Sequence, residues 1–140
     1  ELEPEPEVSD GSVPHQKVNG LIEAGLLCMS EDKKEEAVQH FVEAWKITEE
    51  PDLKYLLTFE AVNLYQSLGR YKEAEELLYI YISKAKLRPD IIDRINMQLS
   101  YIRILRAELI KLGLIDTPID RVPEWVRLNV AELTQLEESR

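Results

Sequence analysis

The side chains of this sequence that are best placed to do chemistry surround the histidine His40. Glu36 lies four residues before His40 and Glu43 lies three residues after it, so on an α-helix the three side chains share one face. An imidazole and two carboxylates are suitable ligands for a divalent metal ion. No second group of ligands accompanies them, and a solvated, charged helix face has the same spacing. We therefore expect no metal site here.

Nucleophilic catalysis has even less support in the sequence. The chain has one cysteine, Cys28, which sits in an apolar helical stretch at a packing position, so we expect an inert thiol. Motifs of the GxSxG, Walker or GxGxxG type do not occur. We predict a protein that is not an enzyme and has no cofactor. A single cysteine also leaves no internal disulfide, which slightly favours a reducing compartment such as the cytoplasm.

The charge of the chain limits its partners. The 140 residues include 27 Asp and Glu against 17 Lys and Arg, a formal net charge of −10. Polyanionic nucleic acids and anionic membrane surfaces are repelled by such a chain unless its basic residues cluster, and here they are spread beside acidic ones. No apolar run approaches the roughly 20 residues that span a bilayer. Because the chain begins at Glu1 rather than Met, an upstream targeting or membrane segment remains open.

The pattern of apolar residues predicts helices and no strand, and hence an all-α chain. Residues 1–14 are acidic and rich in proline, and we expect a disordered tail, or alternatively an acidic arm for a basic partner. Residues 15–140 are predicted to form one domain. The first helix begins near His15, and Ser30 is predicted as the N-cap of the second helix. The remaining boundaries are set by prolines and glycines, namely Pro51, Gly69, Pro89, Gly113 and Pro123.

An internal repeat gives these helices an order. Ala37 and Ala74 each lie early in the second helix of a hairpin, and Phe41 follows the first alanine. Together with the stretch SLGRYKEAEELL at residues 67–78, this pattern resembles the tetratricopeptide repeat. The resemblance covers residues 18–89 and departs from the family at Cys28, Thr58 and Val62. A generic antiparallel helical bundle is the alternative.

The resemblance implies a right-handed stack of antiparallel helical hairpins. In that arrangement residues 15–51 form the first repeat and residues 52–89 the second. Residues 90–140 form a degenerate third unit or a cap made of a long fifth helix and a sixth helix.

A tetratricopeptide-like stack implies a partner-binding groove on its concave face, lined by the first helix of each hairpin. Carried over by position, its residues are Asn19, Ile22, Leu26, Met29, Ser30, Leu56, Phe59, Asn63, Gln66, Ser67, Asn96, Ser100 and Arg103. This apolar, amide-bearing surface suits an amphipathic helix or an extended apolar segment. In the alternative, the fifth and sixth helices cover this face internally.

The last predicted helix has apolar residues on two faces. Val126, Val130 and Leu133 form one stripe, and Trp125 and Leu128 lie off it. We expect Trp125 to be buried, because large aromatic side chains usually are. The alternative is a contact surface for a second copy of the chain, and hence a homodimer.

These observations favour a protein–protein interaction module, an adaptor or scaffold that binds an apolar or amphipathic partner segment. Two alternatives stay open. One is a chaperone for a secreted or membrane-inserting client, which an apolar groove with acidic surroundings would suit. The other is a helical regulatory domain of a larger, membrane-anchored or multidomain protein.

Overall fold

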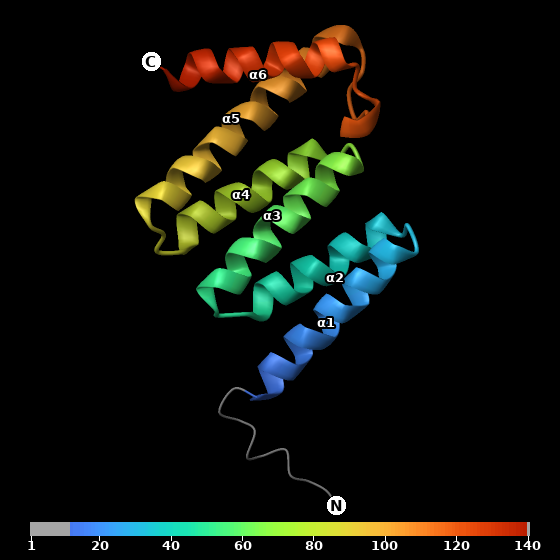
Figure 1. Cartoon of the computed structure of the whole chain (residues 1–140), viewed down its shortest axis with the longest axis vertical. Coiled ribbons are helices and arrows are strands. Elements are labelled where there is room, and N and C mark those ends of the chain that lie inside the picture. Colours follow the sequence, from blue (N-terminus) through green and yellow to red (C-terminus); the bar gives the residue numbers. More distant parts are fainter. Residues whose placement is uncertain (1–11, 140) are drawn as a thin grey trace, which may run out of the picture. The chain divides into compact units, whose positions relative to one another are not determined.

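The computed structural model describes residues 12–139, and Figure 1 shows them as helices joined by short connections. The prediction of an all-α chain is confirmed for these residues, which form six α-helices and no strand. The acidic tail predicted for residues 1–14 lies outside the described residues up to residue 11. The elements are α1 (Ser12–Ser30), α2 (Lys34–Ile47), α3 (Pro51–Ser67), α4 (Tyr71–Lys84), α5 (Pro89–Leu112), the 3-10 helix η2 (Ile119–Arg121) and α6 (Glu124–Glu138).

The chain divides into two compact units whose boundary falls inside α3. The first unit ends at Ala61 and the second begins at Val62, within the segment predicted as the second repeat. Residues 1–61 carry 5 Lys against 15 Asp and Glu, and residues 62–140 carry 12 basic and 12 acidic residues. The whole net charge of −10 therefore belongs to the first unit, and the second is neutral.

In the first unit, α1 and α2 form an antiparallel hairpin that depends on a small residue at the helix contact (Figure 1). A Cβ atom added to Gly25 on α1 would lie 2.7 Å from Cε1 of Phe41 on α2. Phe41 is fully buried, together with Ala37, Val38 and Ala44. Gly25 thus allows the two helices to approach closely, as close packing requires.

The turn between α1 and α2 corrects one prediction. Ser30 is not an N-cap but the last residue of α1, and its hydroxyl donates a hydrogen bond of 2.7 Å to the carbonyl of Leu27. The chain reverses at Asp32, whose φ is 60°, and Lys33 takes the N-cap position of α2 without a side-chain bond. Helix α1 continues through Ser30 because its backbone bonds continue, with the Lys33 N–H bonding the Cys28 carbonyl at 2.7 Å.

A buried polar chain joins α2 to the start of α3. The indole Nε1 of Trp45 donates to Oγ1 of Thr58 at 2.7 Å, and this hydroxyl donates to the carbonyl of Lys54, also at 2.7 Å. The ammonium group of Lys54 lies 4.5 Å from the centre of the Trp45 ring. Thr58, where the resembled family favours an aromatic residue, therefore acts as the hydrogen-bond acceptor of a buried tryptophan.

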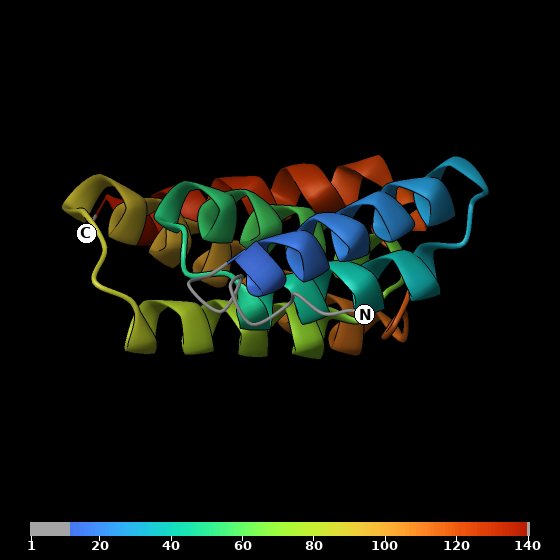
Figure 2. The same ribbon diagram turned by 90° about the horizontal axis from the view of Figure 1, so that it is seen from below.

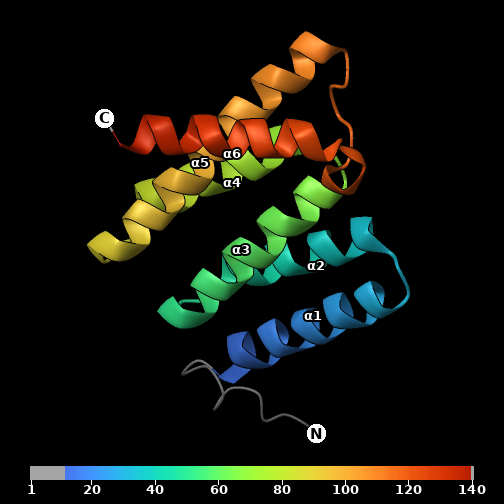
Figure 3. The ribbon, with the colours of Figure 1, turned by 45° about the horizontal axis from the view of Figure 1, so that its top comes forward.

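The second unit is organised around α5, which contacts both α4 and α6. Its buried stripe is Ile95, Leu99, Ile102, Leu105 and Leu109, and Gly113, with φ of 72°, ends the helix. Figure 3 shows α6 lying against α5. Since the stripe repeats every three or four residues, a helix of this length buries one continuous face.

The connection between α5 and α6 packs against the turn between α3 and α4. The hydroxyl of Tyr71, at the start of α4, donates a 2.6 Å hydrogen bond to the carbonyl of Thr117. Gly69 in the turn has φ of 74°, and a Cβ atom there would overlap the carbonyl oxygen of Asp116. Burial raises the pKa of Tyr71 well above its ordinary value, and the nearby Tyr101, Asp120 and Asp116 act in the same direction.

Candidate functional site

An open groove lies in the second unit, between α5 and α6. Its volume is about 800 Å³. Helix α5 contributes Met97, Gln98 and Tyr101 to its walls. From α6 come Trp125, Leu128, Asn129, Ala131, Glu132, Thr134 and Gln135. The surface of the groove is mainly apolar, with a few amides and one carboxylate along it.

Three large apolar side chains of the groove are open to solvent. Trp125 is 63% exposed, Leu128 62% and Met97 52%. The predicted burial of Trp125 is therefore wrong. Helix α6 buries Val126, Val130 and Thr134 instead. Trp125 directly precedes Val126 in the sequence, and successive residues on an α-helix are rotated by about 100°, so Trp125 is turned away from the core.

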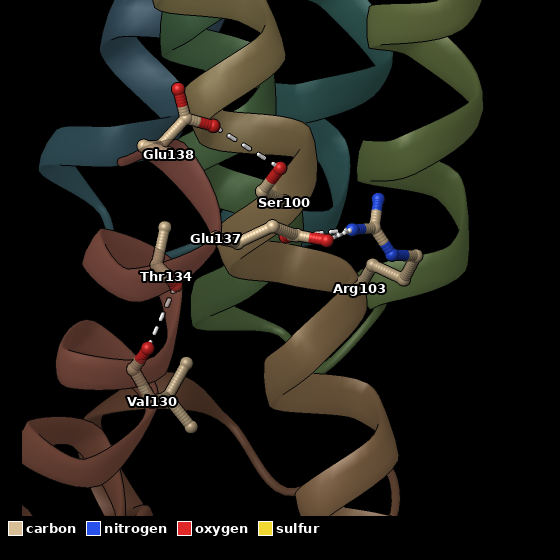
Figure 4. Close-up of polar contacts among 6 residues, drawn as sticks. All are labelled: Ser100, Arg103, Val130, Thr134, Glu137 and Glu138. Atoms are coloured by element: carbon tan, nitrogen blue, oxygen red, sulfur yellow. Dashed lines mark hydrogen bonds and ion pairs between the residues drawn. The ribbon is translucent and has the colours of Figure 1, made fainter. Parts of the chain in front are cut away.

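Polar contacts fix the last turns of α6 on α5. Figure 4 shows Arg103 donating to both carboxylate oxygens of Glu137, at 2.7 and 2.8 Å, and Ser100 within 3.5 Å of Glu138. On α6 itself, the hydroxyl of Thr134 donates to the carbonyl of Val130 at 2.7 Å. Buried valines and these paired side chains join the two walls of the groove.

One charged side chain lines the groove. Glu132 is exposed on α6, and no ion pair involves it within residues 12–139. Opposite, burial raises the pKa of Tyr101, and the nearby guanidinium of Arg127 lowers it to a smaller extent. Tyr101 consequently stays a neutral phenol at physiological pH, and Glu132 carries the charge of the groove.

In the first unit, the predicted groove residues come from α1 and from the first part of α3. Figure 2 shows α1 and the first part of α3 on the same side of α2. Among the predicted groove residues of these helices, Asn19, Leu26 and Met29 on α1 and Leu56 on α3 are exposed, and Ile22 and Phe59 are half-buried. The ring of Phe59 lies 5.0 Å from that of Tyr55. Ser30 is exposed.

In the second unit, the predicted groove residues fall into two groups. Asn63 and Asn96 are exposed, and Ser67 is half-buried. Gln66 and Ser100 are buried. Ser100 and Arg103 both bond to α6, so the sixth helix covers this part of α5. For Ser100, which is buried, that arrangement corresponds to the internally covered face that the sequence left as an alternative, whereas Arg103 stays exposed.

Sequence reasoning missed the groove between α5 and α6 as a site. A signal for it was present, since Trp125 and Leu128 lie off the apolar stripe of α6. Met97 and Tyr101 are spaced by four residues on α5, beside the buried stripe rather than in it. That these two pairs face the same hollow follows only from the way α6 packs on α5.

The described residues show no cluster of metal-binding side chains. Across residues 12–139, no three His, Cys, Asp or Glu side chains gather as metal ligands, so His40, Glu36 and Glu43 do not form such a set. Cys28 is a free, half-buried thiol. In the same stretch of chain, no helix has the length and apolar content required to cross a membrane.

Comparison with models of protein families, with curated proteins and with solved structures finds no match to this chain. The resemblance to the tetratricopeptide repeat therefore rests on the motif of residues 18–89 alone.

Proposed function

We propose that this protein is a non-enzymatic protein-binding module, an adaptor or scaffold built as a tetratricopeptide-like stack of hairpins. Its partner is an amphipathic helix, and we place the binding site in the groove between α5 and α6. The exposed residues Leu26, Met29 and Leu56 of the first unit are a second candidate surface for the same function.

The observation that carries this proposal is the exposure of Trp125, Leu128 and Met97 around one hollow. Soluble proteins tolerate single exposed apolar residues, but a cluster beside a groove is typical of an interaction site. Burying each such side chain contributes about 1.5–3 kcal/mol. Tryptophan is also enriched among the residues that dominate binding energy.

A helix suits this groove better than a small ligand does. The groove is open along its length, and its residues Trp125, Leu128 and Glu132 recur at three- and four-residue spacing on α6. A partner helix would present apolar residues at a matching period and pack as a third helix against α5 and α6. Small-molecule sites, in contrast, usually enclose most of the ligand surface.

A chaperone for an apolar client is a second candidate function, and the first unit supplies its observation. Leu26, Leu27 and Leu56 are exposed there, in the unit that carries the whole net charge of −10. Such a surface suits holding an insoluble segment while like charge keeps the complexes apart. Co-expression separates the candidates, because a chaperone keeps one client soluble and an adaptor joins components that are already folded.

The proposed function is tested by affinity capture from the native source with three proteins. These are the wild type, the groove variant Trp125→Ala plus Leu128→Ala, and the control Ile110→Ala, which truncates an exposed residue of α5 outside the groove. We expect one partner to be held by the wild type and the control and lost from the groove variant.

A photo-crosslinking amino acid at Asn129, which lines the groove, would then identify the bound segment of the partner. Capture of the same partner by all three proteins would show that the groove is not the site. Leu26→Ala plus Leu56→Ala is the variant to use in that case.

A further inference from the structure

We propose that the groove between α5 and α6 selects partner helices that carry a lysine or arginine facing Glu132. This inference rests on the proposed function and adds the chemistry of the partner. The occupant is a basic amphipathic helix, with a large apolar residue that meets Trp125 and a cationic residue about two turns away.

The first step is the isolation of Glu132. Among the ten residues that line the groove it is the one with a charged side chain, and within the described residues it makes no ion pair. Two other carboxylates of the same unit are paired. Glu73 bonds Arg70 at 2.8 Å, and Glu75 bonds Arg106 at 2.6 Å.

The second step is the effect of a bound helix on this carboxylate. An apolar partner that covers Trp125 and Leu128 also covers Glu132, because the three residues share one face of α6. Removing water from an unpaired carboxylate is unfavourable, and a carboxylate on the partner would add repulsion. A cation on the partner replaces the lost hydration with a charge-assisted hydrogen bond. Glu132 thereby rejects neutral and acidic helices.

The third step is the spacing that the partner must have. Trp125 and Glu132 are seven residues apart on α6, about 10.5 Å at the helical rise of 1.5 Å per residue. A partner helix that lies along α6 therefore needs its apolar anchor and its cation seven residues apart. The alkyl stem of that lysine or arginine can pack on Leu128, with its charged end at Glu132.

A second copy of the chain fits this groove less well. If two α6 helices packed antiparallel about Leu128, Glu132 of each would face Glu124 of the other, since both lie four residues from the centre. Two pairs of like charges would then be buried together. The charges favour a partner that brings the missing cation.

The test is a selection of helical peptides on the full-length chain. A displayed library of 18-residue helices, randomised on one face, is selected on the wild type and depleted on Trp125→Ala plus Leu128→Ala. We expect the groove-dependent peptides to be enriched in lysine or arginine at one position, seven residues from a large apolar residue.

Charge reversal then tests whether the cation of the peptide pairs with Glu132. Glu132→Lys should weaken a selected peptide about tenfold or more, a change typical of a close charge pair. Changing the peptide's cation to glutamate should restore binding to this variant. The matched control Glu76→Lys, on the exposed face of α4, should bind like the wild type. Glu132→Gln gives the same comparison if the reversal disturbs folding.

The outcomes separate this inference from the proposed function. Peptides that depend on Trp125 and Leu128 but show no basic preference would overturn the inference and leave the function standing. If no groove-dependent peptide is recovered, both are wrong. Sedimentation that shows a dimer lost in the Trp125 and Leu128 variant would make a second copy the occupant and refute the basic helix.

Discussion

Replacement of Gly69 by alanine should destabilise the second unit more than the same replacement at Gly113. Gly69 lies between α3 and α4 with φ of 74°, where an L side chain is strained. Its added Cβ would also overlap the backbone carbonyl of Asp116, in the connection from α5 to α6. A backbone group cannot rotate away as a flexible side chain can, so the connection itself must move.

The expected loss has two parts. Positive φ costs an alanine about 1–2 kcal/mol. Displacing the connection adds about 1–3 kcal/mol for overpacking, and stretching the 2.6 Å bond from Tyr71 to Thr117 adds about 1 kcal/mol. We therefore expect Gly69→Ala to reduce the free energy of unfolding by about 3 kcal/mol or more.

A control with the same backbone strain exists in the same unit. Gly113 has φ of 72°, but a Cβ atom there would meet nothing within 4 Å. Gly113→Ala should lose only the strain, about 1 kcal/mol. Urea unfolding followed by circular dichroism at both positions measures the difference, and hydrogen exchange of residues 114–122 should speed up only in Gly69→Ala.

Equal losses at Gly69 and Gly113 would refute the reasoning. They would show that the connection does not rest on the turn, and that strain in φ accounts for the whole effect. Unchanged hydrogen exchange in residues 114–122 of Gly69→Ala would lead to the same conclusion.

Three further substitutions test the packing elsewhere. Thr58→Val, which removes the acceptor of the Trp45 indole, should cost about 1–3 kcal/mol in urea unfolding, and Thr58→Ser should restore most of it. Gly25→Ala should cost about 1–3 kcal/mol because the methyl group pushes against the buried ring of Phe41; an unchanged midpoint would show that the ring moves freely. Tyr71→Phe should cost about 1 kcal/mol at neutral pH. Because burial raises the pKa of Tyr71 above the value of about 10 for an unfolded tyrosine, only the unfolded chain ionises it just above pH 10, so the contribution of Tyr71 to stability is constant below that pH and falls above it. The decline should be shallower in Tyr71→Phe, and equal slopes would contradict the assignment.

Local sequence patterns were sufficient to predict most of the helix boundaries. The starts of α3 at Pro51 and of α5 at Pro89 follow from proline, which suits a first helical turn, and the left-handed glycine Gly113 ends α5. Ser30 shows where such rules stop. A serine followed by acids resembles an N-cap, but the backbone bonds of α1 extend through it and the chain turns two residues later.

Only part of the candidate site could be predicted from the sequence. Trp125 and Leu128 visibly lie off the stripe of α6, but periodicity cannot tell a face that packs from a face left open. Ser100 and Arg103 show the same ambiguity, since their spacing on α5 fits a groove and their partners turn out to be residues of α6. Which face is covered depends on residues more than 30 positions away in the chain.

The sequence by itself determined the all-α class and most helix boundaries, though not the turn after Ser30, because helix periods, proline and glycine act within a few residues of one another. It also determined the net charge of −10. The tertiary structure alone decided that Gly69 packs against the connection from α5 to α6 and that Thr58 accepts the hydrogen bond of the Trp45 indole. It also decided that Trp125 is exposed in the groove that Glu132 lines. Those facts depend on contacts between distant segments, and a side chain's pattern along its own helix does not specify which other helix packs against it.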